Sequence, residues 1–341
     1  MNLHLKNCPI TLSSSFKSYS PIGLKQLFSG KKTSHLLPYE SHQPENEAEM
    51  EEMLENRKRI SISGAQEKLS AIWEKGSVRL TKNGEQGTFI LKPFPRDMER
   101  VDMVPANEHL TMQIAKQVFG LRVAENGLIF YQNGEPAYIT KRFDIDYSTG
   151  KKLGKEDFAT LAGKTKETDG EEFKYNYSYE GIADLIKKYV GAYPFALEEF
   201  FKLMVFNFLF SNGDAHLKNF SLLETSQGDH MLSPAYDLVN TRLHVKDPEL
   251  ALKDGLFKDD FLTPSFEANG FLAYDDFWEF GIRIGILKSR VLKVMDQYRS
   301  PLDEVAKLTE RSFLDNDSKN LYLNSYQTRL KSLNYSFTKL I

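Results

Sequence analysis

The chain has 341 residues, a formal net charge of −3 and a single cysteine. That length accommodates two domains or lobes with ample core. The small net charge argues against a protein that coats nucleic acid or a membrane surface, and the lone Cys8 excludes an internal disulfide framework and fits a reducing compartment.

The sequence also gives no sign of membrane insertion or export. The longest apolar run, at 203–210, is far too short to span a bilayer. The first residues lack the hydrophobic core of a signal peptide. We therefore expect a cytoplasmic protein that does not contact a membrane.

Residues 1–58 carry the weakest signal. Their first part is rich in loop-forming residues, and 45–58 is dense in Glu and Arg around a few apolar positions, which predicts a solvated helix. Two interpretations remain for this region, a connecting segment and a partner-binding arm. Composition favours the connecting segment.

From residue 59 the pattern changes to short strands. Alternating runs at 60–63, 69–73, 77–81 and 88–92 predict an antiparallel sheet, with a polar loop at 63–68. This loop holds one glycine and no Gly-Lys-Ser/Thr, so it is not a Walker A motif. Gly64 and its small neighbours would still let backbone N–H groups approach a phosphate. Taken alone, the loop is better explained as a plain hairpin.

Lys92 ends an apolar strand, and the helix that follows offers it a partner. A helical pattern begins at Pro105 and ends at Gly120, and it places Glu108 on the same face as Met112. A carboxylate on a buried face needs a cation. Lys92 is the obvious candidate, and the alternative is an exposed strand-end lysine.

A hairpin then precedes a change of character in the chain. Strands are predicted at 127–131 and 137–144, joined by Asn133-Gly134, which suits a type I′ turn. A polar, Lys-rich stretch follows to about residue 176. We interpret it as the hinge between a β-rich lobe and a helical lobe, with adenine against its backbone.

The most informative stretch lies at 200–241. Residues 200–210 are apolar on every helical face, which predicts a helix buried on all sides and ended by Asn212-Gly213. Asp214 follows directly, Asn219 lies five residues later, and Asp237 follows a strand–turn–strand pattern.

Protein kinases space a proton-accepting Asp, a magnesium-binding Asn and a second magnesium-binding Asp in this way. Phosphoryl transfer needs an orienting base at the acceptor hydroxyl and hard oxygen ligands for magnesium. Each residue alone would fit a cap or a turn. The three together, beside a buried helix, favour a site.

Three further features are weaker. Asp237 is not followed by Phe-Gly, so the switch mechanics of eukaryotic kinases should not be transferred. His216 is interpreted as a structural hydrogen-bonding residue, because no second His or Cys stands at ligand spacing. Residues 315–317 lack the Gly and Glu of a calcium loop and are read as a turn, and 321–341 is predicted to be helical.

The motifs form an ordered set: SISGAQEK at 61–68, NE at 107–108, KRFD at 141–144, EDF at 156–158, NGDAHLKNF at 212–220 and YD at 236–237. This set resembles the HipA family of bacterial serine/threonine toxin kinases over roughly residues 58–245. The loops at 64–68 and 214–219 are each quite specific, and their joint order argues against chance.

The resemblance implies an α+β, two-lobed protein-kinase-like (HipA-like) fold. Residues 1–58 would be an extension or linker, 59–145 a β-rich N-lobe with the phosphate loop, and 146–341 a mostly helical C-lobe, with ATP between the lobes. Longer members carry an additional N-terminal subdomain. This chain resembles the short form, in which that subdomain is a separate small protein or is missing.

The resemblance also implies which residues would bind the nucleotide. Lys92 would contact the ATP phosphates and Glu108 would hold Lys92. The backbone at Lys141 and Phe143 would meet adenine. The phosphate loop would cover the phosphates with Ser63, Gly64, Ala65, Gln66, Glu67 and Lys68.

For the reaction itself, the resemblance implies that Asp214 orients and deprotonates the acceptor hydroxyl, while Asn219 and Asp237 bind Mg²⁺. Ser61 lies at the family's autophosphorylation position, and in short forms Ser63 is a second candidate. A phosphate there adds negative charge beside a loop that holds an anion, so repulsion would silence the enzyme.

By the same resemblance, the target is an aminoacyl-tRNA synthetase and the partner is a helix–turn–helix antitoxin, HipB-like, that binds DNA. The chain shows no basic stripe, so we expect no direct DNA binding by this protein. Two alternatives remain. One is a catalytically weak co-repressor that works with the antitoxin, and the other is a small-molecule or lipid kinase.

Overall fold

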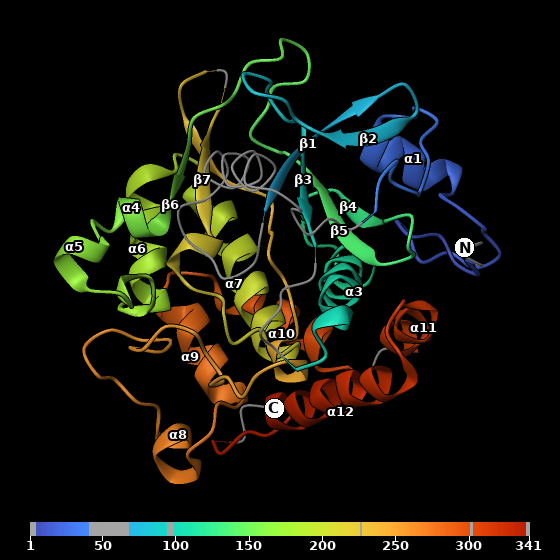
Figure 1. Cartoon of the computed structure of the whole chain (residues 1–341). Coiled ribbons are helices and arrows are strands. Elements are labelled where there is room, and N and C mark those ends of the chain that lie inside the picture. Colours follow the sequence, from blue (N-terminus) through green and yellow to red (C-terminus); the bar gives the residue numbers. More distant parts are fainter. Residues whose placement is uncertain (1–4, 41–67, 94–98, 226, 301–302, 339–341) are drawn as a thin grey trace. The chain divides into compact units, whose positions relative to one another are not determined.

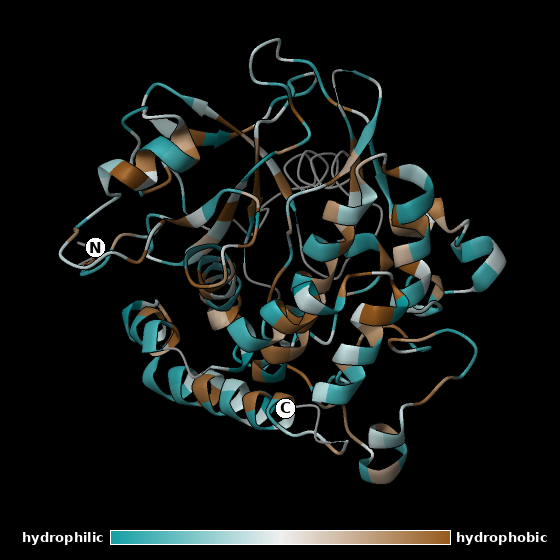
Figure 2. Ribbon diagram, turned by 180° about the vertical axis from the view of Figure 1, so that it is seen from behind, coloured by the Kyte–Doolittle hydropathy of each residue, from teal (hydrophilic) through white to brown (hydrophobic). Residues whose placement is uncertain are grey.

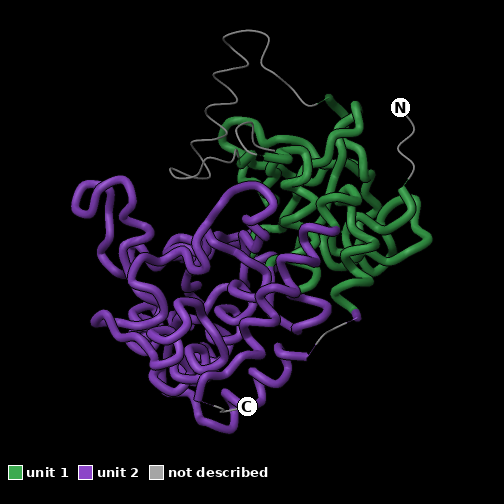
Figure 3. Tube along the Cα trace, turned by 90° about the horizontal axis from the view of Figure 1, so that it is seen from below, with its two compact units in different colours: residues 1–114, 124–143, 304–319 green, residues 115–123, 144–303, 320–341 purple. Residues whose placement is uncertain are grey.

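The computed structural model describes residues 5–40, 68–93, 99–225, 227–300 and 303–338 (Figure 1). The chain divides into two compact units, coloured separately in Figure 3. Unit 1 comprises residues 1–114, 124–143 and 304–319, and unit 2 comprises residues 115–123, 144–303 and 320–341. No helix in the described part of the chain is both long and apolar enough to cross a membrane.

Unit 1 is built on a five-stranded sheet in the order β2-β1-β3-β5-β4, and every pairing is antiparallel, as predicted. The inner strand β3 pairs Leu91 with Leu69 on one side and with Ile139 on the other. The strands are β1 (Leu69–Glu74), β2 (Ser77–Leu80), β3 (Phe89–Lys92), β4 (Asn126–Phe130) and β5 (Pro136–Lys141).

The β4–β5 hairpin exists, but its turn is not type I′ and that prediction was wrong. Type I′ needs positive φ at both central residues, whereas φ is positive at Gly134 (89°) and not at Asn133. Tyr131 N–H donates to Glu135 O at 2.9 Å, and Gly134 N–H donates to Tyr131 O at 2.9 Å. Asn133 instead uses its side-chain oxygen to accept from Glu135 N–H at 3.2 Å, an Asx-type contact.

Residues 5–40 pack into the core of unit 1, where composition had favoured a connecting segment. Their helix α1 (Pro21–Phe28) is capped by Ser20. The backbone of strand β4 bonds to this segment, with Leu128 N–H donating to Pro9 O at 2.7 Å and Phe130 N–H to His35 O at 2.9 Å. The buried members of the segment that join sheet residues in one core are Cys8, Ile10, Tyr19, Leu27, Phe28 and Leu37. The predicted helix at 45–58 lies outside the described residues.

The helix predicted after Pro105 is α3 (Val104–Gln117), preceded by the short 3₁₀ helix η1 (Val101–Met103). Its His109 is fully buried, and His109 Nε2 lies 3.0 Å from Ile10 O. A carbonyl only accepts, so Nε2 carries the proton, while Nδ1 has no partner among the described residues. Burial holds the pKa of His109 down at about 4, so the ring is neutral near neutral pH.

The C-terminal part of unit 1 comes from α11 (Asp303–Arg311) and the first turn of α12 (Asn316–Leu333). Asn7 Nδ2 donates to Arg311 O at 2.8 Å, and the rings of Phe130 and Phe313 lie 5.8 Å apart. Asp315, considered for a calcium loop, caps α12 by accepting from Ser318 N–H at 2.7 Å.

Unit 2 is mostly helical around α7, with a three-stranded antiparallel sheet in the order β6-β7-β8. The strands are β6 (Lys155–Asp157), β7 (Ser221–Glu224) and β8 (His230–Leu232). The helices are α4 (Phe158–Leu161), α5 (Lys166–Asp169), α6 (Tyr179–Tyr189), α7 (Tyr193–Leu209), α8 (Pro264–Asn269), α9 (Tyr274–Arg283) and α10 (Lys288–Arg299). Short 3₁₀ helices are η2 (Phe173–Tyr175), η3 (Leu217–Asn219) and η4 (Thr241–Leu243).

The core of unit 2 is aromatic at the end of α7. Phe210 stacks on Phe206 with ring centroids 4.4 Å apart and on Tyr326 at 5.1 Å. Tyr326 belongs to α12, along which hydrophobic (brown) and hydrophilic (teal) residues alternate in Figure 2. Tyr322, Tyr326 and Leu330 recur at helical spacing on the buried face of this helix. The helix predicted at 200–210 is the second half of α7, which ends at Leu209. It is buried at every position except the half-buried Lys202.

The buried His109 makes a testable contribution to acid sensitivity. Its pKa is about 4 in the folded protein and about 6.5 in an unfolded chain. The unfolded state therefore binds more protons between these values, and stability present above pH ~6.5 is lost towards pH ~4 by up to about 1.4 kcal/mol per pH unit. His109→Gln keeps a donor for Ile10 O without titrating.

Urea unfolding at about pH 7 and about pH 5 measures the difference. Between these conditions the wild type should lose about 2 kcal/mol more stability than His109→Gln. Equal losses in the two proteins would contradict a buried, neutral His109.

Candidate active site

In unit 1, Lys92 and Glu108 form a buried ion pair, as the helix-face argument predicted. Lys92 Nζ lies 2.7 Å from Glu108 Oε1, and each residue is 3% exposed. Lys92 Nζ also lies 5.3 Å from the centre of the Tyr138 ring, which faces it from β5. Taking both charges out of water is costly unless the geometry is good. The pair therefore fixes a cation at the end of β3, as a phosphate-binding lysine requires.

The other nucleotide-binding predictions fall partly outside the described residues. Ser61, Ser63, Gly64, Ala65, Gln66 and Glu67 all lie there, and only Lys68 of the phosphate loop is described, directly before β1. Lys141 ends β5, and its N–H donates to Glu125 O at 2.7 Å. Its Nζ donates to Ser29 at 3.0 Å. The Lys141 N–H is thus engaged within the sheet, and Phe143 follows two residues on.

In unit 2, the end of α7 leads into residues 211–219, here called the catalytic loop. Asn212 N–H donates to Asn207 O at 2.8 Å, and Asn212 Nδ2 donates to Asn207 Oδ1 at 3.1 Å. Gly213 is required at its position, because a Cβ there would lie 2.5 Å from Asp247 Cβ and 2.8 Å from Pro248 O. Gly213 N–H donates to Thr241 Oγ1 at 3.1 Å. The loop therefore leaves the buried helix in a fixed direction.

Asp214 combines fixed geometry with access to solvent. Tyr175 OH donates to Asp214 Oδ1 at 2.7 Å, and Asn219 Nδ2 donates to the Asp214 carbonyl at 2.9 Å. The side chain of Asp214 nevertheless stays 46% exposed. A carboxylate that is held at one oxygen and open to solvent is suited to accept a proton from an incoming hydroxyl.

Asp237 lies at the end of the segment that follows β8. Its φ is 55°, a left-handed conformation that Asp tolerates better than most residues. Asn212 Nδ2 lies 3.5 Å from Asp237 O, and Tyr236 OH donates to Lys218 O at 2.8 Å. Both contacts tie the Asp237 segment to the catalytic loop.

The donor set of Asn219 and Asp237 fits Mg²⁺. Magnesium prefers hard oxygen ligands and takes few from the protein. Asn219 uses its Nδ2 on the Asp214 carbonyl, which leaves the amide oxygen to serve as a ligand. The described residues contain no group of three or more His, Cys, Asp or Glu arranged to hold a metal. That excludes an all-protein cage there and not a site completed by phosphate oxygens.

His216 was expected to be a structural hydrogen-bonding residue, and its surroundings are more apolar than that. It is 6% exposed, and its Nε2 lies 3.9 Å from Asp214 Oδ1. Its Nδ1 has no partner in the part of the chain that the structure describes. The Tyr175 ring meets it edge-on at 5.2 Å. Burial lowers the pKa of His216 to about 4, against the opposing fields of Asp214 and Asp237. His216 is therefore a neutral ring that supports the loop.

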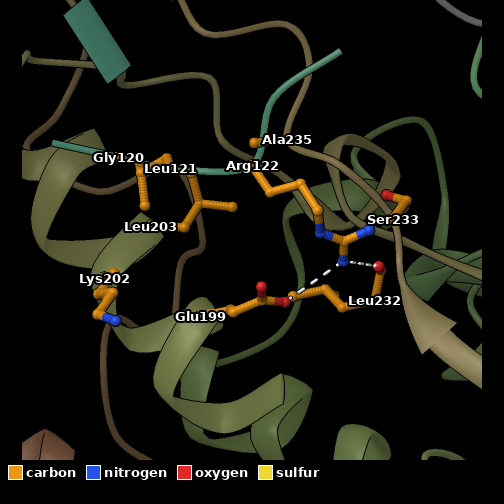
Figure 4. Close-up of a pocket in the computed structure, with 9 residues that line it drawn as sticks. All are labelled: Gly120, Leu121, Arg122, Glu199, Lys202, Leu203, Leu232, Ser233 and Ala235. Atoms are coloured by element: carbon orange, nitrogen blue, oxygen red, sulfur yellow. Dashed lines mark hydrogen bonds and ion pairs between the residues drawn. The ribbon is translucent and has the colours of Figure 1, made fainter. Parts of the chain in front are cut away.

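A small cavity of about 100 Å³ lies beside the segment that leads to Asp237 (Figure 4). Arg122 donates to Leu232 O and lies 3.3 Å from Glu199 Oε2. Ala235 N–H donates to Arg122 O at 2.8 Å. The cavity is lined by Gly120, Leu121, Arg122, Glu199, Lys202, Leu203, Leu232, Ser233 and Ala235. None of these is a predicted site residue, so we interpret the cluster as a brace for the backbone before Asp237.

Sequence reasoning missed the side chains that hold the site. Tyr175 lies in the stretch predicted to be a hinge, and Tyr236 lies in the last motif. Arg122 lies just after the end of the predicted helix, where the sequence indicates no site. Tyr179 OH donates to Ala215 O at 2.9 Å, within the catalytic loop. The only signal was a run of tyrosines at 175–179 in an otherwise polar stretch.

Comparison with known proteins places the chain among kinase-like proteins. A family model described as the HipA-like C-terminal domain matches residues 60–305. A Haemophilus influenzae protein provisionally named a kinase is 28% identical over 348 residues, which cover 96% of this chain and 95% of that protein. The Shewanella oneidensis serine/threonine-protein kinase toxin HipA is 24% identical over 300 residues, covering 82% of this chain and 64% of that protein.

Two solved structures share the fold. Shewanella oneidensis HipA, solved with HipB and operator DNA, superposes with a TM-score of 0.62 and 20% identity, covering 80% of this chain and 65% of that chain. The Helicobacter pylori proinflammatory kinase CtkA has a TM-score of 0.52 and 16% identity, covering 81% and 91%. The α+β kinase-like fold is therefore confirmed. The chain spans about two thirds of either HipA comparison, and nearly all of the Haemophilus relative.

The buried ion pair gives a stability test. Removing one partner leaves the other charge buried, so Lys92→Met or Glu108→Leu alone should each cost about 3–5 kcal/mol. The double variant should cost less than the sum, because two apolar side chains can share the site. Denaturant unfolding of the four proteins measures the coupling.

Lys141→Met provides the matched control, since Lys141 also ends a strand of the same sheet but is half-exposed. Its cost should be within about 1 kcal/mol. Additive losses for Lys92 and Glu108 would show that the pair is not coupled.

Proposed function

Because the chain belongs to the family of the HipA-like C-terminal domain, whose model matches residues 60–305, we propose that it is an ATP-dependent kinase that phosphorylates serine or threonine in a protein. The observation that carries this proposal is the geometry at Asp214. One carboxylate oxygen is held by Tyr175 at 2.7 Å while the side chain stays 46% exposed.

Each predicted residue then has a chemical task. Asp214 orients the acceptor hydroxyl and takes its proton as that oxygen bonds to the γ-phosphorus. The bond from the γ-phosphorus to the β–γ bridging oxygen breaks, and ADP leaves. Asn219 and Asp237 supply oxygen ligands for Mg²⁺, which when bound neutralises charge on the phosphates. Lys92, fixed by Glu108, contributes a positive charge to the phosphates.

The backbone around these residues supports that assignment. Asn219 bonds the Asp214 carbonyl, and Asn212 links Asn207 to the carbonyl of Asp237. The two segments that carry the acid and amide groups are thus tied to one buried helix, α7. Preorganised groups of this kind lower a barrier because they do not need to reorganise during reaction.

We further propose that the kinase is the toxin of a bacterial toxin–antitoxin system and arrests translation and growth by phosphorylating an aminoacyl-tRNA synthetase in the cytoplasm. A relative is named a kinase toxin, and a structural neighbour is recorded with HipB and operator DNA. The proposed partner is a HipB-like helix–turn–helix antitoxin that makes the DNA contacts. Autophosphorylation at Ser61 or Ser63 would lower activity by adding charge near the phosphate loop.

The base assignment is tested by replacing its carboxylate. Asp214→Asn keeps the shape but removes the proton acceptor, so transfer from γ-labelled ATP should fall by about 10²- to 10⁴-fold. Asp237→Asn and Asn219→Ala should raise the magnesium concentration needed for half-maximal transfer. Asp260→Asn, in an exposed loop with positive φ (53°), is the matched control and should transfer phosphate like wild type.

Phosphoproteomics after induced expression identifies the target, with Asp214→Asn as the blank. A single phosphorylated synthetase together with growth arrest supports the toxin proposal. Arrest that persists with Asp214→Asn would favour a co-repressor that needs no catalysis. Transfer of label to a small molecule or lipid, with no labelled protein, would remove the protein-kinase proposal.

A further inference from the structure

Tyr175 is held against the carboxylate of Asp214. Its hydroxyl donates to Asp214 Oδ1 at 2.7 Å. Among the described residues, this is the one hydrogen bond between the Tyr175 segment and that carboxylate. Tyr175 lies thirty-nine positions before Asp214 in the chain, at the end of η2, and is half-buried. The contact is therefore created by folding and not by local sequence.

The phenol is held in place from several sides. Its ring meets the His216 ring edge-on at 5.2 Å, and Lys174 Nζ lies 4.9 Å from the ring centre. The Tyr175 carbonyl accepts from Lys253 N–H at 2.9 Å. Tyr179, four residues on, donates to Ala215 O at 2.9 Å. The segment 175–179 thus forms hydrogen bonds with two adjacent residues of the catalytic loop, Asp214 and Ala215.

The phenol also keeps its proton. Burial raises the pKa of Tyr175, and the nearby carboxylate of Asp214 raises it further. The hydroxyl is therefore a donor at physiological pH. A charged acceptor makes such a hydrogen bond roughly twice as strong as a neutral one.

Only part of the carboxylate is used by this contact. Asp214 has two oxygens, and the side chain remains 46% exposed with Oδ1 bonded to Tyr175. His216 Nε2 faces the same oxygen at 3.9 Å. Both neighbours approach Oδ1, so Oδ2 is the oxygen that we assign to an incoming hydroxyl.

We infer that Tyr175 is a positioning residue for phosphoryl transfer: its hydroxyl fixes Oδ1 of Asp214 so that Oδ2 accepts the proton of the acceptor hydroxyl. This inference rests on the proposed function of Asp214. In the step, the acceptor oxygen bonds to the γ-phosphorus, its proton moves to Oδ2, and the bond to the β–γ bridging oxygen breaks to release ADP. Tyr175 keeps its own proton throughout.

The test is a kinetic double-mutant cycle on the full chain with Tyr175→Phe, Asp214→Asn and the double variant. Phenylalanine keeps the ring against His216 and Lys174 and removes only the hydroxyl. We expect kcat for transfer from γ-labelled ATP to fall about ten- to a hundredfold, the range for one hydrogen bond to a charged group. KM for ATP should change less than about twofold, because Tyr175 acts after nucleotide binding.

Tyr177→Phe is the matched control. Tyr177 lies two residues on and is also half-buried, and its hydroxyl makes no hydrogen bond to Asp214 among the described residues. This variant should match the wild type in kcat and KM. Adding Tyr175→Phe to Asp214→Asn should cause no further loss of the residual activity, since the carboxylate that it positions is gone.

Several outcomes would overturn the inference. An unchanged kcat would show that the hydroxyl does not matter, and a raised kcat would show that Tyr175 blocks the acceptor position instead. An equal fractional loss in the Asp214→Asn background, or a fall in thermal stability that accounts for the lost activity, would make the role structural. Failure of the proposed function is distinct, because the wild type would then transfer no more phosphate than Asp214→Asn.

Discussion

The burial of α7 is the constraint on which the catalytic loop depends. Eleven residues of this helix are buried, from Ala196 to Leu209. Phe210, which directly follows the helix, stacks on both Phe206 and Tyr326. A helix with so much buried apolar surface cannot rotate or slide without exposing that surface. The loop that follows the helix therefore starts from a fixed point. Gly213 is needed in this loop because a side chain there would collide with Asp247.

Polar side chains next to this core form hydrogen bonds between segments that are far apart in the sequence. Asn207 lies inside α7 and is 2% exposed, and Asn212 connects it to the carbonyl of Asp237. Buried amides of this kind must find partners or destabilise the fold. Among the described residues, Asn212 Nδ2 and Asn207 Oδ1 find partners, whereas Asn207 Nδ2 and Asn212 Oδ1 do not. The contacts that form link the Asp237 segment to the helix.

Tyrosine hydroxyls also hold the catalytic loop in place through hydrogen bonds. Tyr175, Tyr179 and Tyr236 donate to the Asp214 carboxylate, the Ala215 carbonyl and the Lys218 carbonyl. The Tyr179 ring is buried and the rings of Tyr175 and Tyr236 are half-buried, and each carries a directional donor at its tip. Such a side chain suits a contact between a core and a half-exposed site. In unit 1 the Lys92–Glu108 pair does comparable work with charges. Both devices hold a polar group rigid, but Asp214 stays 46% exposed whereas Lys92 is buried.

The sequence by itself determined most of the elements and indicated a set of candidate site residues. Strand alternation predicted the antiparallel sheet, and the helical spacing of Glu108 and Met112 predicted the ion pair with Lys92, because period and burial are local properties. The spacing of Asp214, Asn219 and Asp237 indicated phosphoryl transfer for the same reason. Only the tertiary structure decided that residues 5–40 complete a core, that the turn at Asn133 is not type I′, and that Tyr175 and Arg122 brace the site. Those contacts join residues far apart in the chain, and a tyrosine or an arginine in a polar stretch carries no local sign of the partner it will meet.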